Sequence, residues 1–498
     1  MPDQFWIHLF ALPRDSTLPL QVQLRSVVLN AIHEERLLPG AALPSSRDLA
    51  KLLGLSRNTV SAAYEQLVDS GYLAARPRAG VFVADAPPAQ PGQPVNLDVG
   101  GGHRPPHWSR RMLRKLADRP TLSKPEDWRG YPYPFVYGHY DPQQFPVEDF
   151  RECCVRSLAR SQLPDWTPDF EQEDVPALVE QIRTRLLPKR GVHAQKNEIL
   201  VTVGAQQCFH LLAELLLEEN TRLGFEEPGY PHARNTFSLR EPRFLRVPVD
   251  GDGVRMDRLP PLDYLFVTPS HQSPTTATLS LERRRRLLER AEQDDFVLIE
   301  DDYEAENIYT GEVMPALKSV DRAGRVIYVG SLSKSLSPAV RLGYIVAPSQ
   351  VITELRALRH AMVRHPSAFL QHAYALFISL GHHEAHARRV NLVMAERMQR
   401  CAQALRKHLP AFRFELPGGG ASIWVEGPSW LDCNQLAAAA RRHGVLIEPG
   451  DVFFAEPPFP CPYFRLRLSS ITAEQIGAGL QALARAVDEL VAGRKRPA

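Results

Sequence analysis

The chain has 498 residues, of which 44% are hydrophobic and 23% charged, and its formal net charge is +2 at pH 7. This length predicts two or three domains with sizeable cores, and the near-neutral charge favours no particular partner. No apolar run approaches the ~18 residues of a membrane span, and the start of the chain lacks the basic region of a signal peptide. Six cysteines without a CxxC spacing indicate reduced thiols in a cytoplasmic protein.

The first 84 residues are predicted to contain three helices. In 18–40, apolar residues recur at helical spacing, and Pro39-Gly40 predicts where this helix ends. Two shorter helices are expected in 43–73. This order of elements predicts a small helical fold whose last two helices are joined by a short turn.

Capping residues place the two shorter helices. Ser45 or Ser46 is the candidate cap of the first, and Gly54 breaks it. Ser56 caps the second, which Gly71 closes. Two short helices joined by a glycine turn form a helix-turn-helix, and 72–85 predicts two short strands around RPRAG, that is, a hairpin or wing.

The exposed start of the second short helix carries side chains that are able to read DNA. Arginine can bond guanine and asparagine can bond adenine in the major groove, while serine and threonine can hold phosphates. The predicted DNA contacts are Arg47, Ser56, Arg57, Asn58 and Thr59, with Arg76 and Arg78 in the wing. A packing module with a solvated polar face is the alternative, which charge alone does not exclude.

A proline-rich stretch separates this segment from the rest. Residues 85–94, DAPPAQPGQP, include four prolines and no long apolar side chain, as is typical of an extended linker. We therefore predict three parts: a DNA-binding domain at 1–84, a linker at 85–97 and a large domain at 98–498.

The large domain alternates apolar strands with amphipathic helices. The expected strands are 198–204, 264–270, 296–303, 325–331 and 342–348. This alternation predicts an α/β fold with a mainly parallel sheet and helices on both faces. Ligands bind such sheets at the carboxyl ends of the strands, where polar residues gather: Gly204 to Gln206, Ser270 to Gln272, Asp301 to Tyr303, and Ser331 to Lys334.

These residue types meet the needs of pyridoxal 5′-phosphate. The Lys334 amine is able to form an imine, and the carboxylates of EDDY can hold a cationic ring nitrogen. Serines, Arg341 and a helix that begins at Ala205 can hold a phosphate, and Tyr230 can stack on a planar ring. A solvated surface lysine is the alternative for Lys334.

Two resemblances support this interpretation. Residues 18–84, with LPSSRDLAKLLGLSRNTVSAAYEQLVDSGYL and RAGVFV, resemble the winged helix-turn-helix of GntR-type bacterial regulators. Roughly residues 130–490, with VTVGAQQ, FEEPGYPHAR, IEDDYEAE, GSLSKSLSPAVRLGY and FRLRLSS, resemble fold-type I aminotransferases, which have a smaller C-terminal subdomain. Together they resemble the MocR/GabR group of GntR regulators.

The resemblance implies a role for each cofactor residue. Lys334 would be the Schiff-base lysine, Asp301 the partner of the pyridine nitrogen, Tyr303 the partner of the ring hydroxyl and Tyr230 the stacking ring. Ser331, Ser333, Arg341 and the amides of Ala205 and Gln206 would hold the phosphate. Only analogy favours Asp301 over Asp302.

The resemblance also implies an effector site and a dimer. Arg467 would pair with the carboxylate of an amino compound, with Arg465 as the fallback, because both lie on one face of a strand. Type I sites form at subunit interfaces, so a head-to-tail homodimer is expected, in which Tyr137 reaches the phosphate of the other subunit. The chain departs from the family at Thr276, where a glycine is usual, and in a long segment at 155–195 that carries Arg183 and Arg185.

Three functions are compatible with these features. The leading hypothesis is a pyridoxal-phosphate-dependent transcription regulator that binds double-stranded DNA and senses an amino compound through an imine. The alternatives are an active aminotransferase with an accessory DNA-binding domain, and a DNA-binding protein whose large domain serves only for dimerisation. His382 and His386 lie one helical turn apart but lack an evident third ligand, so no metal is expected.

Overall fold

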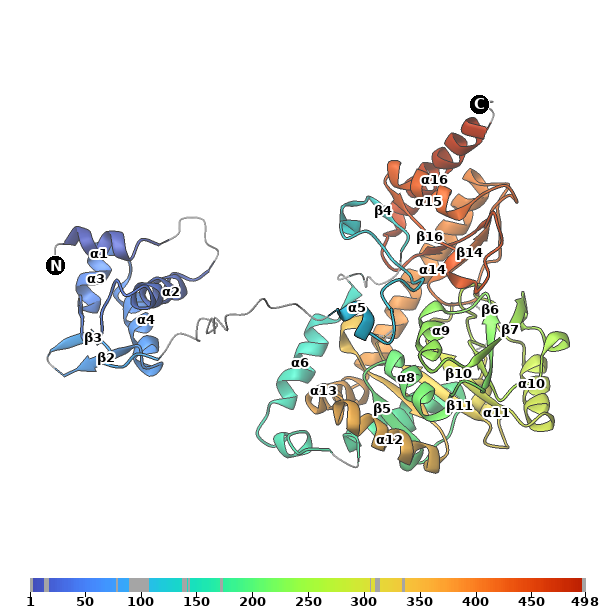
Figure 1. The fold of residues 1–498 in the computed structure, drawn as a ribbon, viewed down its shortest axis with the longest axis horizontal. Helices are drawn as coiled ribbons and strands as arrows, with labels where there is room; N and C mark the ends of the chain where they lie inside the picture. The colour runs from blue at the N-terminus through green and yellow to red at the C-terminus, as the bar shows by residue number, and fades with distance from the viewer. Residues whose placement is uncertain are drawn as a thin grey trace. The chain divides into compact units, whose positions relative to one another are not determined.

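The computed structural model describes residues 3–12, 18–77, 79–88, 107–136, 141, 144–170, 173–304, 306–309, 314–333 and 336–494. The chain divides into two compact units, Met1–Leu113 and Arg114–Ala498, both drawn in Figure 1. Three predicted site residues, Arg78, Tyr137 and Lys334, lie outside the described residues. The narrower boundaries at residues 84 and 98 remain a prediction.

The first unit is a helical fold with a small sheet. Its helices are α1 (Asp3–Leu9), α2 (Leu20–His33), α3 (Ser46–Leu53), α4 (Arg57–Asp69) and α5 (Trp108–Arg111). Its antiparallel sheet has the order β1 (Ala42–Leu43), β3 (Gly80–Val83), β2 (Leu73–Arg76). Leu24, Leu49 and Val60 are fully buried where α2, α3 and α4 pack together. The predicted helix-turn-helix and hairpin are therefore present.

The structure confirms a serine cap at the start of α3 and of α4, but the predicted end of α2 is wrong. The Ser45 hydroxyl accepts the Asp48 N–H at 3.2 Å, and the Ser56 hydroxyl accepts the Thr59 N–H at 3.1 Å. However, α2 ends at His33 and not at Pro39, because the chain turns through Glu35 at φ +56°. This turn buries Leu37 in the core of the unit.

The second unit is built on an eight-stranded sheet. Its strands are β5 (Ile199–Thr202), β6 (Arg222–Glu227), β7 (Arg243–Asp250), β8 (Gly253–Val254), β9 (Tyr264–Val267), β10 (Val297–Asp302), β11 (Val326–Ser331) and β12 (Gly343–Val346). Their order is β5-β12-β11-β10-β9-β6-β7-β8. All strands except β12 and β8 run in one direction, so the sheet is mainly parallel, as predicted.

Helices cover both faces of this sheet, because alternate strand residues are apolar on each side. Leu200, Ile299 and Ile345 pack with α8 (Ala205–Leu216), α9 (Pro231–Phe237) and α12 (Ser349–Val363). On the other face, Val201 packs with α7 (Pro176–Gln181) and α13 (Ala368–Ser379), and Leu298 packs with α10 (Leu281–Gln293). The remaining helices here are α6 (Val147–Ser157) and α11 (Leu317–Val320).

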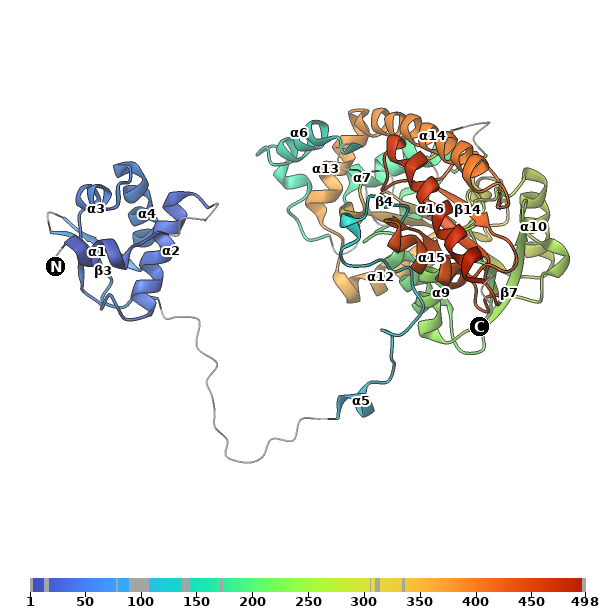
Figure 2. The same cartoon turned by 90° about the horizontal axis from the view of Figure 1, so that it is seen from above.

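A smaller antiparallel sheet forms the predicted C-terminal subdomain. Its order is β13 (Arg413–Phe414), β14 (Ser422–Glu426), β17 (Tyr463–Arg467), β16 (Glu448–Pro449), and β4 (Tyr133–Pro134) pairs with β15 (Val445–Leu446) separately. The helices α14 (His382–His408), α15 (Cys433–Arg442) and α16 (Ala473–Arg494) share its apolar core, and Figure 2 shows α14 and α16 side by side. Among the described residues, no helix has the length and hydropathy to cross a bilayer.

Candidate cofactor and effector site

The polar strand ends of the large sheet meet around one cavity of about 290 Å³. Every cofactor and effector residue that was predicted and is described lines it: Ala205, Gln206, Tyr230, Asp301, Tyr303, Ser331, Ser333, Arg341, Arg465 and Arg467. These residues come from β10, β11, β17, the start of α8 and the turns between them. For the residues of the large unit's main sheet this convergence follows because six of its strands end at the same edge, whereas Arg465 and Arg467 come from β17 of the smaller sheet.

The N-terminus of α8 forms one end of the cavity. Gly204 caps this helix at φ +73° and ψ 169°, a conformation that essentially only glycine adopts. A Cβ on Gly204 would lie 3.2 Å from Cζ of Arg341, and a Cβ on Gly343 would lie 2.9 Å from the Ala205 nitrogen. The two glycines therefore bring the helix N-terminus and a guanidinium together, as an anionic phosphate requires.

The polar side chains at this end of the cavity already form hydrogen bonds within the protein. Arg341 donates to the Val203 carbonyl at 3.1 Å, and the Ser333 hydroxyl exchanges hydrogen bonds with the backbone of Leu342 at 3.2 Å. The Gln206 amide donates to Thr236. These contacts hold the cationic and hydroxyl groups in place beside the helix N-terminus.

Asp301 and Asp302 are adjacent in β10 and therefore face opposite sides of the sheet. Asp301 lines the cavity. Asp302 instead accepts from Arg190 Nε at 2.8 Å and from the Tyr328 hydroxyl at 2.9 Å. Burial, the largest single effect, raises the Asp302 pKa, but the charge of Arg190 and the hydrogen bonds from Ser270, Arg190 and Tyr328 together hold it below its ordinary value. Of the two aspartates, only Asp301 therefore lines this cavity.

Two tyrosines line the same cavity. Tyr230 packs edge-on against Phe209, with 6.4 Å between the ring centroids. Tyr303 follows Asp302, and burial raises its pKa above the ordinary value, so its hydroxyl stays protonated at neutral pH. A protonated hydroxyl is able to donate a hydrogen bond to a ligand oxygen.

The two candidate effector arginines already have carboxylate partners. Arg467, only 6% exposed, is ion-paired with Glu304. Arg465 donates to Glu448 at 2.6 Å and lies over the Phe453 ring at 4.6 Å. The side chains of both arginines line the cavity, so the structure brings both to the predicted place.

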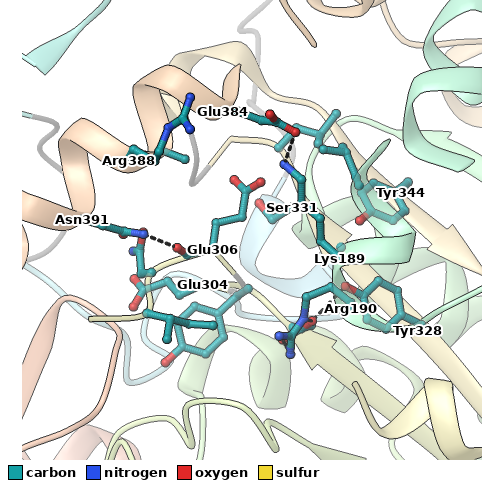
Figure 3. Close-up of a pocket in the computed structure, with 18 of the residues that line it drawn as sticks. Lys189, Arg190, Glu304, Glu306, Tyr328, Ser331, Tyr344, Glu384, Arg388 and Asn391 are labelled. Atoms are coloured by element: carbon teal, nitrogen blue, oxygen red, sulfur yellow. Dashed lines mark hydrogen bonds and ion pairs between the residues drawn. The ribbon is translucent and has the colours of Figure 1, made fainter. Parts of the chain in front are cut away.

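A larger cavity of about 630 Å³ adjoins this site and shares Tyr303 and Ser331 with it. Figure 3 shows Glu304 on its wall, together with the Lys189–Glu384 ion pair at 2.8 Å. Arg388, which is exposed, also lines it. Glu304 therefore borders the larger cavity, while its partner Arg467 borders the smaller one.

Most of the described residues that were predicted to contact DNA are exposed on the first unit. Arg47, Arg57 and Asn58 are exposed. The Ser56 hydroxyl is engaged within α4, since it also bonds the Thr59 hydroxyl at 2.8 Å. Arg76 pairs with Asp85 at 3.4 Å and lies over the Phe82 ring.

Other residues singled out in the sequence lie away from the cavity. Arg183 pairs with Glu180 at 2.8 Å, and neither Arg183 nor Arg185 lines the cofactor cavity. His382 lies 3.5 Å from Asp149, and no group of three metal-ligating side chains occurs in the described part of the chain.

Sequence reasoning missed several residues of the site. Phe209, His232, Ser273 and Pro338 also line the cavity. Ser273 directly follows Ser270 to Gln272, which were recognised at a strand end, but the serine itself was not assigned. Arg190 and Glu304 contact Asp302 and Arg467 from 112 and 163 residues away, so no local pattern signals them.

Two family models match the chain. "Bacterial regulatory proteins, gntR family" matches residues 20–83, and "Aminotransferase class I and II" matches residues 170–483. The chain therefore belongs to the transcriptional regulators that join a GntR-type helix-turn-helix to an aminotransferase class I and II domain. It is similar to the HTH-type transcriptional regulator TauR of Rhodobacter capsulatus, 41% identical over 94% of this chain and 96% of that protein. It is 31% identical to the probable rhizopine catabolism regulatory protein MocR of Rhizobium meliloti, over 90% of each chain.

Solved aminotransferases share the fold of the large unit. LysN, an α-aminoadipate aminotransferase of Thermus thermophilus complexed with N-(5′-phosphopyridoxyl)-L-leucine, matches with a TM-score of 0.70 and 28% identity, covering 77% of this chain and 99% of that one. A Pyrococcus horikoshii kynurenine aminotransferase in complex with PMP matches at 0.68 and 25% identity, covering 72% and 91%. A glycine-lined helix N-terminus, a carboxylate and an aromatic ring at one cavity fit pyridoxal phosphate. The family match and the solved aminotransferases make pyridoxal phosphate the cofactor of this domain.

Proposed function

We propose that the chain is a transcription regulator in which the aminotransferase-like domain senses an amino compound through pyridoxal phosphate and thereby changes DNA binding. One observation carries the proposal: the described residues predicted for cofactor and effector line a single cavity, and the chain also has a GntR-type helix-turn-helix. Pyridoxal phosphate supplies an aldehyde that condenses with amines and a ring that withdraws electrons from them.

In this proposal each described residue has a role that its place in the cavity supports, and the role of Lys334 rests on the resemblance to aminotransferases. Lys334 holds the cofactor covalently, and Asp301 keeps the ring nitrogen protonated. Tyr230 stacks on the ring and Tyr303 donates to the ring hydroxyl. The phosphate is held by Ser331, Ser333, Arg341 and the Ala205 and Gln206 amides, and Arg467 pairs with an anionic group of the amino compound.

The DNA contact is proposed for the start of α4. Arg57 and Asn58 are exposed there and suit the major groove, while Arg47 and Arg76 suit the backbone. We expect Arg57→Ala to relax sequence preference and Arg47→Ala to weaken binding to all sequences alike.

A homodimer is proposed as the working form. Trp108, Met112 and Leu113 lie close together in the chain and are 64%, 54% and 100% exposed, and exposed apolar side chains that gather in one place mark interaction surfaces. Replacing all three by serine should shift the chain from dimer to monomer in light scattering. Monomeric wild-type protein would contradict the proposal.

The test of sensing is fluorescence anisotropy on DNA from upstream of the protein's own gene, with and without pyridoxal phosphate and amines. A change in DNA affinity that Asp301→Asn abolishes supports a sensor. Unchanged affinity under all conditions overturns it.

An aminotransferase is the second candidate function, favoured by the described carboxylate, tyrosines, serines and arginines of the cavity. The chain is also 28% identical to aromatic-amino-acid aminotransferase 1 of Thermococcus litoralis, over 70% of this chain and 86% of that protein. Conversion of the bound cofactor to its amine form by an amino acid, and its return by a keto acid, would establish this activity.

A further inference from the structure

The Glu304–Arg467 pair connects two different sheets. Glu304 follows β10 of the large sheet, whereas Arg467 ends β17 of the small sheet. Glu304 also accepts the Ala421 N–H at 3.0 Å, just before β14. The carboxylate therefore holds the end of the large-sheet strand against two points of the small subdomain.

The segment after Glu304 continues this attachment. The Tyr309 N–H donates to the Gly418 carbonyl at 2.9 Å, and the Gly420 N–H donates to the Asn307 carbonyl at 2.8 Å. Ile308 and Gly419 form an isolated antiparallel bridge. Movement of Glu304 would thus pull on a backbone contact between the two subdomains.

Arg465, the other candidate effector arginine, has its carboxylate partner within its own sheet. Arg465 and its partner Glu448 are register neighbours on β17 and β16, within the same sheet. The ring of Phe453 covers the guanidinium as well. Displacing Glu448 would leave the contact between the two subdomains in place, and Phe453 would still hold the Arg465 guanidinium, so Arg465 is the fixed member and Arg467 is the exchangeable one.

The larger cavity offers space for the Glu304 side chain when it leaves Arg467. An unpaired buried carboxylate would be costly, but Glu304 borders the larger cavity of about 630 Å³, where Arg388 is exposed. Arg467 borders the smaller cavity, where the ligand would lie. The two partners can therefore separate into two different spaces.

We propose that Glu304 is a resident counter-ion that an anionic amino compound must displace from Arg467. The inference rests on the proposed function and makes Glu304 a specificity-determining residue. Amines without an anionic group enter beside the intact pair. Amino compounds that carry a carboxylate or sulfonate replace Glu304 and release the contact between the subdomains, so only this class produces the structural signal.

The test compares β-alanine with n-propylamine, which has a methyl group in place of the carboxylate. Both are titrated into full-length protein loaded with pyridoxal phosphate, and the absorbance of the bound cofactor is followed. In Glu304→Gln, the affinity for β-alanine relative to n-propylamine should rise about tenfold, the equivalent of about 1.4 kcal/mol. An unchanged or lower ratio overturns the proposal.

Two matched variants sharpen the result. Glu306→Gln removes a carboxylate that lies 3.3 Å from His383 and lines the same larger cavity, and it should leave the ratio unchanged. Glu448→Gln should also leave it unchanged, and a rise there would identify Arg465 as the receptor and overturn the role of Glu304. If Glu304→Gln does not fold, Glu304→Asp keeps the charge but retracts it, and it should raise the ratio by a smaller factor.

A separate readout distinguishes this inference from the proposed function. Calorimetry with propionate, which has no amine, measures access to Arg467 without any cofactor chemistry. Tighter propionate binding by Glu304→Gln supports the counter-ion even if wild-type protein shows no response to amines. Equal propionate binding by both proteins overturns it even if the amine response is present.

Discussion

Exchanging the two neighbouring aspartates of β10 for asparagine should produce two different defects. Asp301 borders the cofactor cavity, and Asp302 is paired with Arg190 on the other side of the strand. Asp301→Asn should lose cofactor affinity and keep stability, because it removes a ligand-facing charge. Asp302→Asn should lose stability first, because it leaves a buried guanidinium without its carboxylate.

The magnitudes follow from the surroundings of each residue. The side chain of Arg190 is 6% exposed and that of Asp302 is 0% exposed, and breaking a buried pair of this kind costs about 3–5 kcal/mol. For Asp301, a hydrogen bond to a charged group contributes about 1.5–3 kcal/mol. This corresponds to a loss of about 10-fold to 150-fold in pyridoxal phosphate affinity.

The assay pairs cofactor titration with urea unfolding for wild type and both variants. Asp301→Asn should bind cofactor weakly at an unchanged unfolding midpoint, and Asp302→Asn should unfold at lower urea concentration. Arg190→Met is the matched control, since it should destabilise like Asp302→Asn. The reasoning is refuted if Asp302→Asn keeps its stability and loses the cofactor as completely as Asp301→Asn.

Three further predictions concern single residues of the large unit. Burial raises the pKa of Glu226 to about 7, so this carboxyl costs stability as pH rises from its unfolded pKa toward 7. Glu226→Gln should therefore stabilise the fold by up to about 3 kcal/mol at about pH 8 and much less at about pH 5; an equal effect at both pH values in urea unfolding would contradict this. Gly204→Ala should displace Arg341 and weaken cofactor binding about tenfold, at a strain of about 1–3 kcal/mol, whereas Gly324→Ala, also at positive φ but with open space around it, should leave binding intact. Thr276 has φ +65°, a backbone conformation that favours glycine, so Thr276→Gly should raise the free energy of unfolding by about 1 kcal/mol, and a lower value would show that its contacts outweigh the strain.

Local signals in the sequence predicted much of the fold. Ser56, and Ser45 as one of two candidates with Ser46, were recognised as caps because a cap bonds a backbone N–H only three residues away. The strand ends of the cofactor site were recognised because a short apolar run stops at a polar residue. Strands β6 and β7 were missed, since charged residues interrupt both: RLGFEE ends in two glutamates and RFLRVPVD has arginines within its first half.

Long-range contacts account for what local patterns could not supply. The choice between Asp301 and Asp302 depends on which face of β10 meets the cavity, and that is decided by the packing of the whole sheet. Arg190 comes from a 3₁₀ turn, Leu187–Arg190, whose preceding helical turns gave no sign of a buried ion pair. A pairing over more than a hundred residues has no periodicity to reveal it.

The residues proposed to hold the cofactor and those proposed to bind the effector also differ in how the fold brings them together. The cofactor residues come from the ends of strands in one sheet and from a helix that follows one of them, so fold alone brings them together. Arg467 comes from the second sheet, and what it can bind depends on whether Glu304 remains beside it. Substitutions at Asp301 should therefore change whether the cofactor is held, and substitutions at Glu304 should change which amino compound is selected. Because Glu304 is attached to both sheets, the binding of an anionic amino compound to Arg467 and the release of the contact between the subdomains would be one event.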